Sequence, residues 1–289
     1  MSEEPIKPSW LKIRAPIDPR FGEIRRTTAQ LGLSTVCDSS HCPNISDCWS
    51  RGHATFILLG NVCTRNCSFC AVRTGNPRGV VDAGEPERVA AAVEALGLRY
   101  VVLTTVTRDD LPDLGAGLIA ATVEAVRRRN PGTRIELLIP DMQGRVDVLS
   151  TVVSSKPDVI GHNLETVKRL QGRARDPRAS YFISLDLLKA VKRLDPSILT
   201  KSSLMLGMGE DRSEIIQALR DLRDAGVDLL ALGQYIRPRG CSLEVVRYLE
   251  PEEFEALGEE ARGMGFRYVA SAPLVRSSYN AQQAFGAEG

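Results

Sequence analysis

Short apolar runs alternate with segments of helical periodicity along most of the chain, beginning near Ala54. The runs have the length and the composition of buried strands, with turn residues on either side. They cover Thr55–Leu59, Tyr100–Thr105, Arg134–Ile139, Asp158–Gly161, Leu199–Leu206 and Asp228–Leu232.

Amphipathic segments between these runs predict helices. The first of them begins at a proline and ends before a glycine, as helices commonly do. The predicted helices cover Pro86–Leu96, Leu118–Arg129, Arg145–Val153, Glu165–Leu170, Tyr181–Leu194, Ser213–Ala225 and Pro251–Met264. Strands that alternate with helices predict βαβ units and a parallel sheet. Six such units fit an α/β fold of the partial (β/α)6 TIM-barrel type, although a doubly wound sheet has the same alternation.

The first fifty residues have a different character. They are rich in proline, arginine and polar residues, and they show few periodic apolar positions. We expect an extension that is draped over the rest of the chain and anchored by Trp10 and Leu11. We therefore divide the chain into an N-terminal extension (residues 1–53), a barrel (residues 54–265) and a C-terminal tail (residues 266–289).

Composition and charge exclude some partners. The chain is 43% hydrophobic and 25% charged, and Lys+Arg 37 against Asp+Glu 36 leaves a formal charge of +1. This balance gives no reason to expect a general affinity for nucleic acid or for membrane surfaces. The N-terminus lacks a secretion signal, and no apolar run is long enough to span a bilayer. We expect a cytoplasmic protein.

Six of the seven cysteines form two triplets with different spacing. The first triplet is C-x4-C-x5-C and the second is C-x3-C-x2-C, and their members are Cys37, Cys42 and Cys48, and then Cys63, Cys67 and Cys70. Clustered cysteines in a chain without a secretion signal favour metal ligation over disulfides. Three thiolates can hold three irons of a cubane iron–sulfur cluster and leave the fourth metal position free. The triplets therefore predict two clusters, each with one ligand that is not cysteine.

Zinc is the alternative occupant of the second triplet. A structural zinc site usually has four protein ligands, with cysteines in C-x2-C pairs. The second triplet has a different spacing and no nearby histidine to complete it, since His53 lies upstream on the predicted strand. The spacing therefore disfavours zinc.

The second triplet resembles the signature of the radical S-adenosylmethionine (SAM) superfamily. It follows directly on the run Thr55–Leu59, as a loop at the end of a first barrel strand would. Membership implies that this triplet holds a 4Fe–4S cluster whose free iron chelates the amino and carboxylate groups of SAM. One electron from the cluster then cleaves SAM to methionine and a 5′-deoxyadenosyl radical, which abstracts hydrogen from an unactivated carbon.

Within that superfamily, nearly the whole chain is similar to the lipoyl synthase family. The segments that carry the resemblance are Lys7–Leu11, Cys37–Trp49, Thr55–Thr74, Arg108–Leu111, His162–Thr166, Lys201–Glu210, Gly233–Tyr235 and Arg276–Ala281. One departure is Leu114, which stands where the family usually has a glycine in the sequence D-G-G-A. It weakens the transfer of backbone contacts at this loop.

The resemblance implies a function. It is the insertion of two sulfur atoms at C6 and C8 of an octanoyl chain that is amide-linked to a lysine of a lipoyl carrier domain. The carriers would be E2 subunits of 2-oxoacid dehydrogenases and the H protein of glycine cleavage, and a ferredoxin or flavodoxin would supply electrons.

The resemblance also implies that the first triplet binds an auxiliary 4Fe–4S cluster, the sulfur source, which is consumed. Ser278 would be its fourth ligand. A serine alkoxide is a hard ligand on a rather soft iron, so it should exchange more readily than a thiolate. This makes Ser278 a candidate catalytic residue as well as a metal ligand. Without the resemblance, Arg276–Tyr279 would be interpreted as a polar tail.

Four residues are candidates for SAM binding. The segment His162–Glu165 is similar to the one by which biotin synthase holds the SAM ribose, so Asn163 and Glu165 are expected there, although either could instead cap the next helix. Thr104 follows the second strand, where the superfamily surrounds the methionine end of SAM. Arg175 could meet the SAM carboxylate, and a solvated run of charges is the alternative.

Four other residues have simpler interpretations. We expect His162 to be a packed, hydrogen-bonded histidine and Cys241 to be a small buried hydrophobic residue. Arg108 and Asp109 are expected either to contact SAM or to form a structural ion pair with each other.

Two other functions compete with sulfur insertion into an octanoyl chain. A methylthiotransferase-like radical SAM enzyme would act on RNA or a ribosomal protein, but it would carry an accessory domain for which the chain leaves no room. The second rival is a non-catalytic metal-binding module, which would not cleave SAM.

Overall fold

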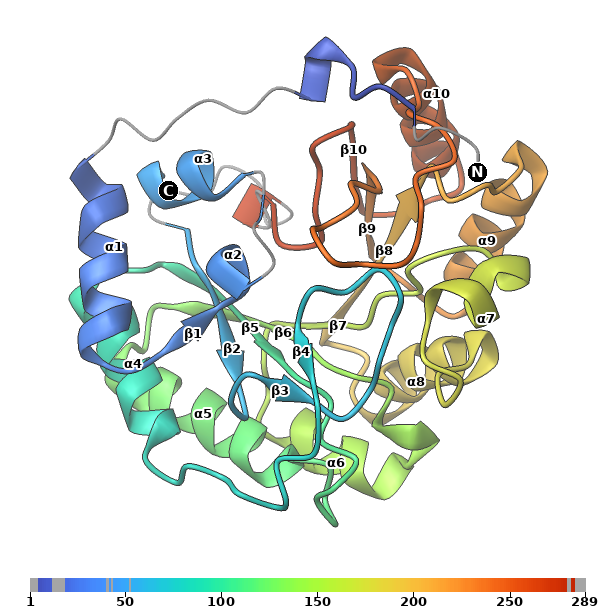
Figure 1. Ribbon diagram of the computed structural model, residues 1–289. Coiled ribbons are helices and arrows are strands. Elements are labelled where there is room, and N and C mark those ends of the chain that lie inside the picture. The colour runs from blue at the N-terminus through green and yellow to red at the C-terminus, as the bar shows by residue number, and fades with distance from the viewer. Residues whose placement is uncertain are drawn as a thin grey trace.

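The computed structural model is an open barrel of parallel strands (Figure 1). It describes residues 5–11, 19–39, 42, 44–51, 53–279 and 282–283. Eight strands form one sheet in the order β1-β2-β5-β6-β7-β8-β9-β10. All neighbours from β2 to β10 are parallel, whereas β1 is antiparallel to β2. The bounds are β1 Ser34–Thr35, β2 Thr55–Leu58, β5 Tyr100–Thr105, β6 Arg134–Leu138, β7 Val159–Gly161, β8 Leu199–Leu206, β9 Leu229–Gln234 and β10 Tyr268–Ser271.

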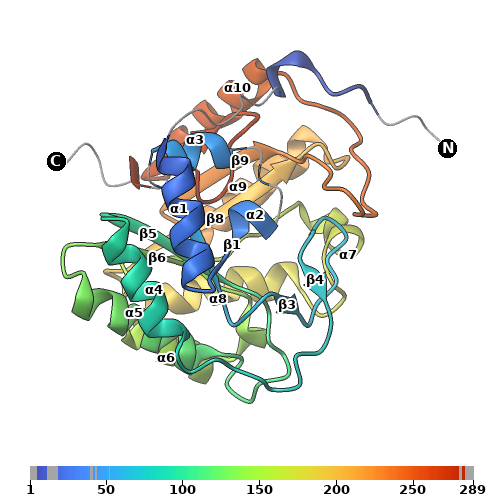
Figure 2. The same cartoon turned by 60° about the vertical axis from the view of Figure 1, so that its left-hand side comes forward.

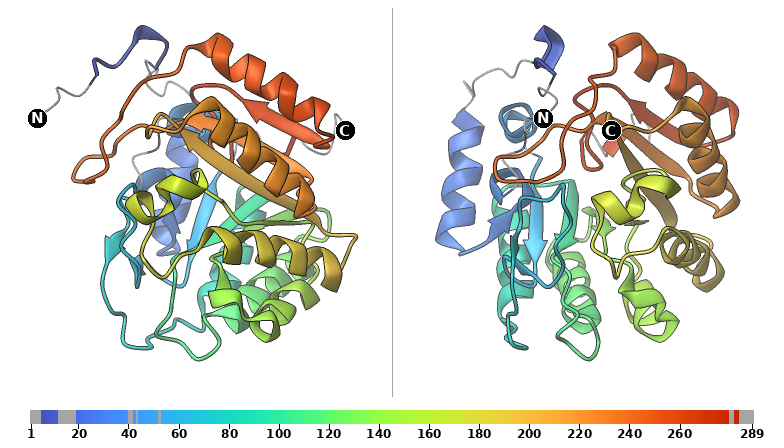
Figure 3. Two further views of the ribbon diagram at one scale, coloured as in Figure 1. Left: turned by 90° about the vertical axis from the view of Figure 1, so that its right-hand side faces the viewer. Right: turned by 45° about the vertical axis from the view of Figure 1, so that its right-hand side comes forward.

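Helices connect successive parallel strands and form a layer outside them (Figures 1 and 3). Because β1 and β10 are the two edges of the sheet in the described part of the chain, the barrel is partial, as the sequence predicts. The connecting helices are α4 Glu85–Ala95, α5 Ala116–Arg129, α6 Val146–Ser154, α7 Gln171–Ala174, α8 Tyr181–Leu194, α9 Arg212–Asp224 and α10 Pro251–Gly263. Short 3-10 turns occur at Ser9–Leu11, Met142–Gly144 and Lys168–Leu170.

Helix α9 illustrates why these segments fold as they do. Its Ile215, Leu219 and Leu222 recur at helical spacing and are buried against the sheet. Burying one such side chain stabilises the fold by about 1.5–3 kcal/mol. At the start of α9, the backbone N–H of Asp211 donates to the Glu214 carboxylate at 2.9 Å, so one unpaired N–H of the first turn is satisfied.

The predicted strands and six of the seven predicted helices agree with the structure to within two residues. The helix predicted over Glu165–Leu170 is wrong. Glu165 forms an isolated parallel bridge with Leu204, and its φ of 70° lies in the left-handed region. Its N–H donates to the Ser203 carbonyl, so pairing with β8 replaces the helical hydrogen bonds there.

The N-terminal segment contains more regular structure than the sequence predicts. It includes α1 Pro19–Gln30, α2 Val36–Ser39 and α3 Ile45–Ser50. Helix α1 was missed because only Ile24 and Thr28 of its residues are buried, which leaves a weak apolar period. It lies beside α4 (Figure 2), where Arg88 Nε donates to the Leu31 carbonyl at 2.9 Å.

The segment around α3 meets the C-terminal segment beside the barrel. Asn44 Nδ2 donates to the Leu274 carbonyl at 2.6 Å, and the Tyr279 hydroxyl donates to Asp47 Oδ2 at 3.1 Å. Strand β10 also joins the sheet from within the segment assigned to the tail. Pro43, Asn280 and Ala281, which belong to the segments that carry the family resemblance, lie outside the described residues.

Among the described residues, no helix combines the length and the apolar character needed to cross a membrane.

The close approach of the C-terminal segment to β9 depends on a residue without a side chain. A Cβ atom on Gly233 would overlap the carbonyl oxygen of Val275. We therefore predict that Gly233→Ala displaces the C-terminal segment and lowers the free energy of unfolding by roughly 1–3 kcal/mol, as overpacking does. Chemical denaturation monitored by circular dichroism measures the change. Gly172→Ala is the control, because nothing lies within 4 Å of its added Cβ. Equal stability of the two variants would contradict the prediction.

Candidate active site

A cavity of about 530 Å³ lies inside the barrel, between the segments that carry the two cysteine triplets. Its wall includes all of the first triplet, together with Cys70, Asn163, Glu165 and Ser278. These residues come from the N-terminal segment, from loops that follow β2 and β7, and from the C-terminal segment. The fold thus brings most of the predicted site residues to one cavity.

The loop Cys63–Cys70, which we call the cluster loop, begins at a small two-stranded sheet. Strand β3 (Val62–Cys63) is parallel to β4 (Arg73–Thr74). The N–H of Cys70 donates to the Cys67 carbonyl at 3.0 Å, and the N–H of Arg65 donates to Cys63 Sγ at 3.4 Å. The loop is therefore folded tightly around its cysteines.

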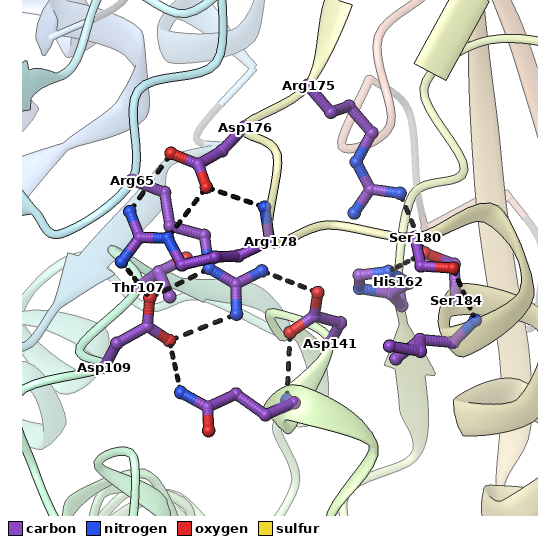
Figure 4. Close-up of polar contacts among 12 residues, drawn as sticks. Arg65, Thr107, Asp109, Asp141, His162, Arg175, Asp176, Arg178, Ser180 and Ser184 are labelled. Carbon is purple, nitrogen blue, oxygen red and sulfur yellow. Dashed lines mark hydrogen bonds and ion pairs between the residues drawn. The ribbon is translucent and has the colours of Figure 1, made fainter. Parts of the chain in front are cut away.

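Arg65 ties this loop to the carboxyl ends of β5 and β6 (Figure 4). Its buried guanidinium contacts Asp109 at 3.0 Å and Asp141 at 2.6 Å. Burial alone would raise the pKa of both carboxyls, but the hydrogen bonds from Arg65 hold each pKa below its usual value. The predicted ion pair between Arg108 and Asp109 is wrong, because Arg108 pairs with Asp110 at 2.8 Å.

A second hydrogen-bond chain runs from His162 through Ser184 to Arg175 (Figure 4). His162 Nδ1 lies 2.9 Å from the Ile139 carbonyl, which can only accept, so Nδ1 carries the proton. Nε2 then accepts from the Ser184 hydroxyl at 2.8 Å. Ser184 in turn accepts from Arg175 Nη1 at 2.8 Å. Burial, reinforced by the positive charge of Arg175, lowers the pKa of His162 to about 4, so the ring is neutral.

Arg175 is buried, so the alternative of a solvated run of charges is wrong for this residue. Its guanidinium donates to Gln171 and Ser184, and Arg175 is not among the residues that line the cavity. Thr104 is also buried, and its hydroxyl donates to the Leu138 carbonyl at 2.9 Å.

Two cysteines of the second triplet, Cys63 and Cys67, are not among the residues that line the cavity. Cys241 is a buried cysteine, as expected.

Asn163, which lines the cavity beside Glu165, carries a buried acceptor that is not used. The Oδ1 atom of Asn163 is buried and has no hydrogen-bond partner. Burial raises the pKa of Glu165, against the opposing effects of Arg175 and of a hydrogen bond from Asn163. A buried acceptor without a partner is costly, and a ligand with hydroxyl donors would satisfy it. The pair therefore fits a polyol such as a ribose.

The first triplet and Ser278 line the cavity together, because the segment around α3 is hydrogen-bonded to the C-terminal segment there. Burial raises the pKa of Cys42, while Arg276 beside it acts in the opposite direction. Burial also raises the pKa of Cys70, to about 12. A metal that bound these thiols would therefore have to displace their protons.

The cysteines have the chemistry that iron–sulfur clusters require. All seven are free thiols. Among the described residues, no three His, Cys, Asp or Glu side chains are arranged to hold a single metal ion. The thiolates of a cubane bind different irons, so they stand farther apart than the ligands of one ion. The unpartnered Asn163 acceptor and the free thiols around one cavity fit SAM and iron–sulfur clusters.

Sequence reasoning missed the residues that fix the position of the cluster loop. Arg65, Asp141 and Asp176 were not predicted; Arg65 and Asp141 follow strands β3 and β6, and Asp176 follows helix α7. Their partners are far away in the chain, since Arg65 and Asp141 are separated by 76 positions. The signal that could have identified Asp141 as a site residue is an acidic side chain shortly after the end of a strand.

Comparison with known proteins identifies the fold and the relatives. The model of the radical SAM superfamily matches residues 57–233. Among solved structures, methylornithine synthase has a TM-score of 0.52 at 13% identity, and the match covers 94% of this chain and 89% of that one. The FeFe-hydrogenase maturase of Carboxydothermus hydrogenoformans has a TM-score of 0.55 at 14% identity, covering 84% and 55%. Both share the fold.

Curated relatives are much more similar in sequence. The chain is 51% identical over 285 residues to the lipoyl synthase of Thermus thermophilus, which covers 98% of this chain and 88% of the relative. It is also 51% identical to the lipoyl synthase of Pyrobaculum calidifontis, over 96% of both chains. These relatives favour sulfur insertion over the methylthiotransferase and the non-catalytic module.

Arg65 lies between the buried carboxylate of Asp141 and the partly buried carboxylate of Asp109, so its removal takes an ion-pair partner from both. We predict that Arg65→Met lowers the free energy of unfolding by about 3–5 kcal/mol, the usual cost of breaking a buried ion pair. Denaturant unfolding of the metal-free protein measures this. The control is Arg129→Met, which removes an exposed pair with Glu94 and should cost less than about 1 kcal/mol. A loss no larger than that of the control would show that Arg65 does not hold the loop.

Proposed function

Because the chain belongs to the lipoyl synthase family of the radical SAM superfamily, we propose how its residues insert sulfur at C6 and C8 of a protein-bound octanoyl group. Enzymes of this family use SAM and 4Fe–4S clusters. These cofactors supply the one-electron chemistry that breaks unactivated C–H bonds, which acid and base side chains cannot do. The protein contributes the arrangement of the reacting groups.

The observation that carries the proposal is the single cavity that both cysteine-bearing segments border. The second triplet would hold the cluster that binds SAM, with Asn163 and Glu165 at the ribose hydroxyls. The first triplet and Ser278 would hold the auxiliary cluster that donates sulfur. An octanoyl chain between them would lie within reach of both, which is the proximity that two successive insertions need.

Thr104 and Arg175 have supporting roles in this proposal. Arg175 does not line the cavity, but its positive charge partly offsets the burial that raises the pKa of Glu165 and so favours the carboxylate. Thr104 joins β5 to β6 below the cluster loop. We retain both as SAM-site residues, acting through the shape and charge of the wall.

The proposed organisation of the chain follows from these roles. Residues 1–53 would contribute the auxiliary-cluster cysteines, residues 54–265 the barrel, and residues 266–289 the serine ligand. The enzyme acts on a lipoyl carrier and uses a reductant. We propose octanoylated E2 subunits and glycine cleavage H protein as carriers, a ferredoxin or flavodoxin as the donor, and the cytoplasm as the location.

The proposed function predicts the iron content of the enzyme and the products that it forms. Protein reconstituted without oxygen should bind about eight irons, four for each cluster, and should form 5′-deoxyadenosine from SAM with dithionite. An octanoylated lipoyl-domain peptide should gain two sulfur atoms, as followed by mass spectrometry. Cys70→Ala should abolish SAM cleavage, whereas Cys241→Ala, which removes a buried cysteine outside the triplets, should retain it. Colourless protein that binds only zinc would exclude the proposal.

Ser278 has its own prediction. If its alkoxide is the exchangeable ligand of the auxiliary cluster, Ser278→Ala should still cleave SAM but should form little or no product with two sulfur atoms. Ser277→Ala, at the neighbouring cavity residue, is the matched control and should form normal product. The measurement is the ratio of sulfur inserted to 5′-deoxyadenosine formed. An unchanged ratio in Ser278→Ala would rule out an essential ligand role.

A further inference from the structure

The cluster loop is bound along its length by one short segment that follows β7. This segment, residues 174–178, begins at the end of α7, and we call it the clasp. The N–H of Ser68 donates to the Ala174 carbonyl at 2.9 Å. The N–H of Asn66 donates to Asp176 Oδ2 at 2.8 Å. Two chain segments separated by about a hundred positions are therefore joined residue by residue.

Asp176 is the centre of the clasp (Figure 4). Its side chain is buried, and besides the N–H of Asn66 its carboxylate accepts the N–H of Arg178 at 3.0 Å and Arg178 Nε at 2.8 Å. Arg178 Nη2 also donates to the Thr64 carbonyl at 2.7 Å. The carboxylate therefore connects the Arg178 end of the clasp to the first half of the cluster loop.

The backbone of Asp176 faces a cysteine of the second triplet. Its N–H donates to Cys67 Sγ at 3.4 Å. Hydrogen bonds to cluster sulfurs are among the factors that set the reduction potential of an iron–sulfur cluster. An N–H dipole that points at the sulfur stabilises the more negative, reduced state, so it raises the potential.

We propose that Asp176 is a positioning residue for the cluster held by the second triplet. Its carboxylate fixes the clasp against the cluster loop, so that its own N–H reaches the Cys67 sulfur. The consequence is a cluster that is easier to reduce and that loses iron more slowly. The proposal rests on the proposed function, because it requires a cluster at Cys63, Cys67 and Cys70.

The test compares three variants of the full-length reconstituted enzyme. Asp176→Ala removes the carboxylate, whereas Asp176→Asn keeps an oxygen that can accept the Asn66 N–H but loses the charge that pairs with Arg178. Arg173→Ala is the control, since Arg173 is an exposed cation just before the clasp. The cluster of the second triplet is identified by the change of its electron paramagnetic resonance spectrum when SAM is added.

Two readouts separate positioning from a general loss of stability. The first is the midpoint potential of the SAM-responsive cluster, which should become more negative in Asp176→Ala and partly recover in Asp176→Asn. The second is the rate at which a chelator removes iron, which should rise about tenfold in Asp176→Ala, as for the loss of other residues that support metal ligands. Arg173→Ala should match the wild type in both.

A potential and an iron-loss rate in Asp176→Ala equal to those of the wild type would overturn the proposal. A lower unfolding free energy with an unchanged potential in Asp176→Ala would also overturn it, because the role would then be structural only. If the wild type itself shows no SAM-responsive cluster, the proposed function fails. If that cluster is present and the variants match it, only the role of Asp176 fails.

Discussion

The cluster loop contains eight residues and three cysteines, so it cannot bury an apolar core of its own. Its shape must come from bonds to other parts of the chain. Arg65 supplies the strongest of these, because its buried guanidinium lies between Asp109 and Asp141. Each charge alone would be expensive to bury, and the three together satisfy one another. The residues around the second triplet depend on this arrangement, since Asp109 also contacts Thr64, Gln143 and Arg178.

The first triplet is held in a different way. The N-terminal segment buries few side chains of its own. It is held in place by contacts with the C-terminal segment, such as the hydrogen bond from Asn44 to Leu274. The C-terminal segment in turn passes over β9 at Gly233, where there is no side chain to obstruct it. The barrel therefore determines where the N-terminal and C-terminal segments meet, and thereby which residues lie beside Cys42.

The sequence was sufficient to predict the alternating strands and helices, because strands such as Tyr100–Thr105 are largely apolar and helices such as α9 have a clear apolar period. It failed where tertiary contacts override local preference. Glu165 continues a helix-like pattern, yet its backbone pairs with β8. Helix α1 was missed because it rests on other segments through few apolar residues. The partners of Arg65 and Asp176 could not be read from spacing, since hydrogen bonds between distant loops leave no periodic signal.

The hydrogen-bond chain at His162 has a consequence for the conditions in which the site keeps its shape. An ordinary histidine gains a proton between pH 7 and pH 6, and its hydrogen bonds reorganise when it does. His162 is protected from this change, because its buried ring remains neutral until about pH 4. Ser184 therefore continues to donate to the ring and to accept from Arg175 through mild acidification. The hydrogen bonds that hold Arg175 near Glu165 therefore stay the same when the pH of the cell falls mildly.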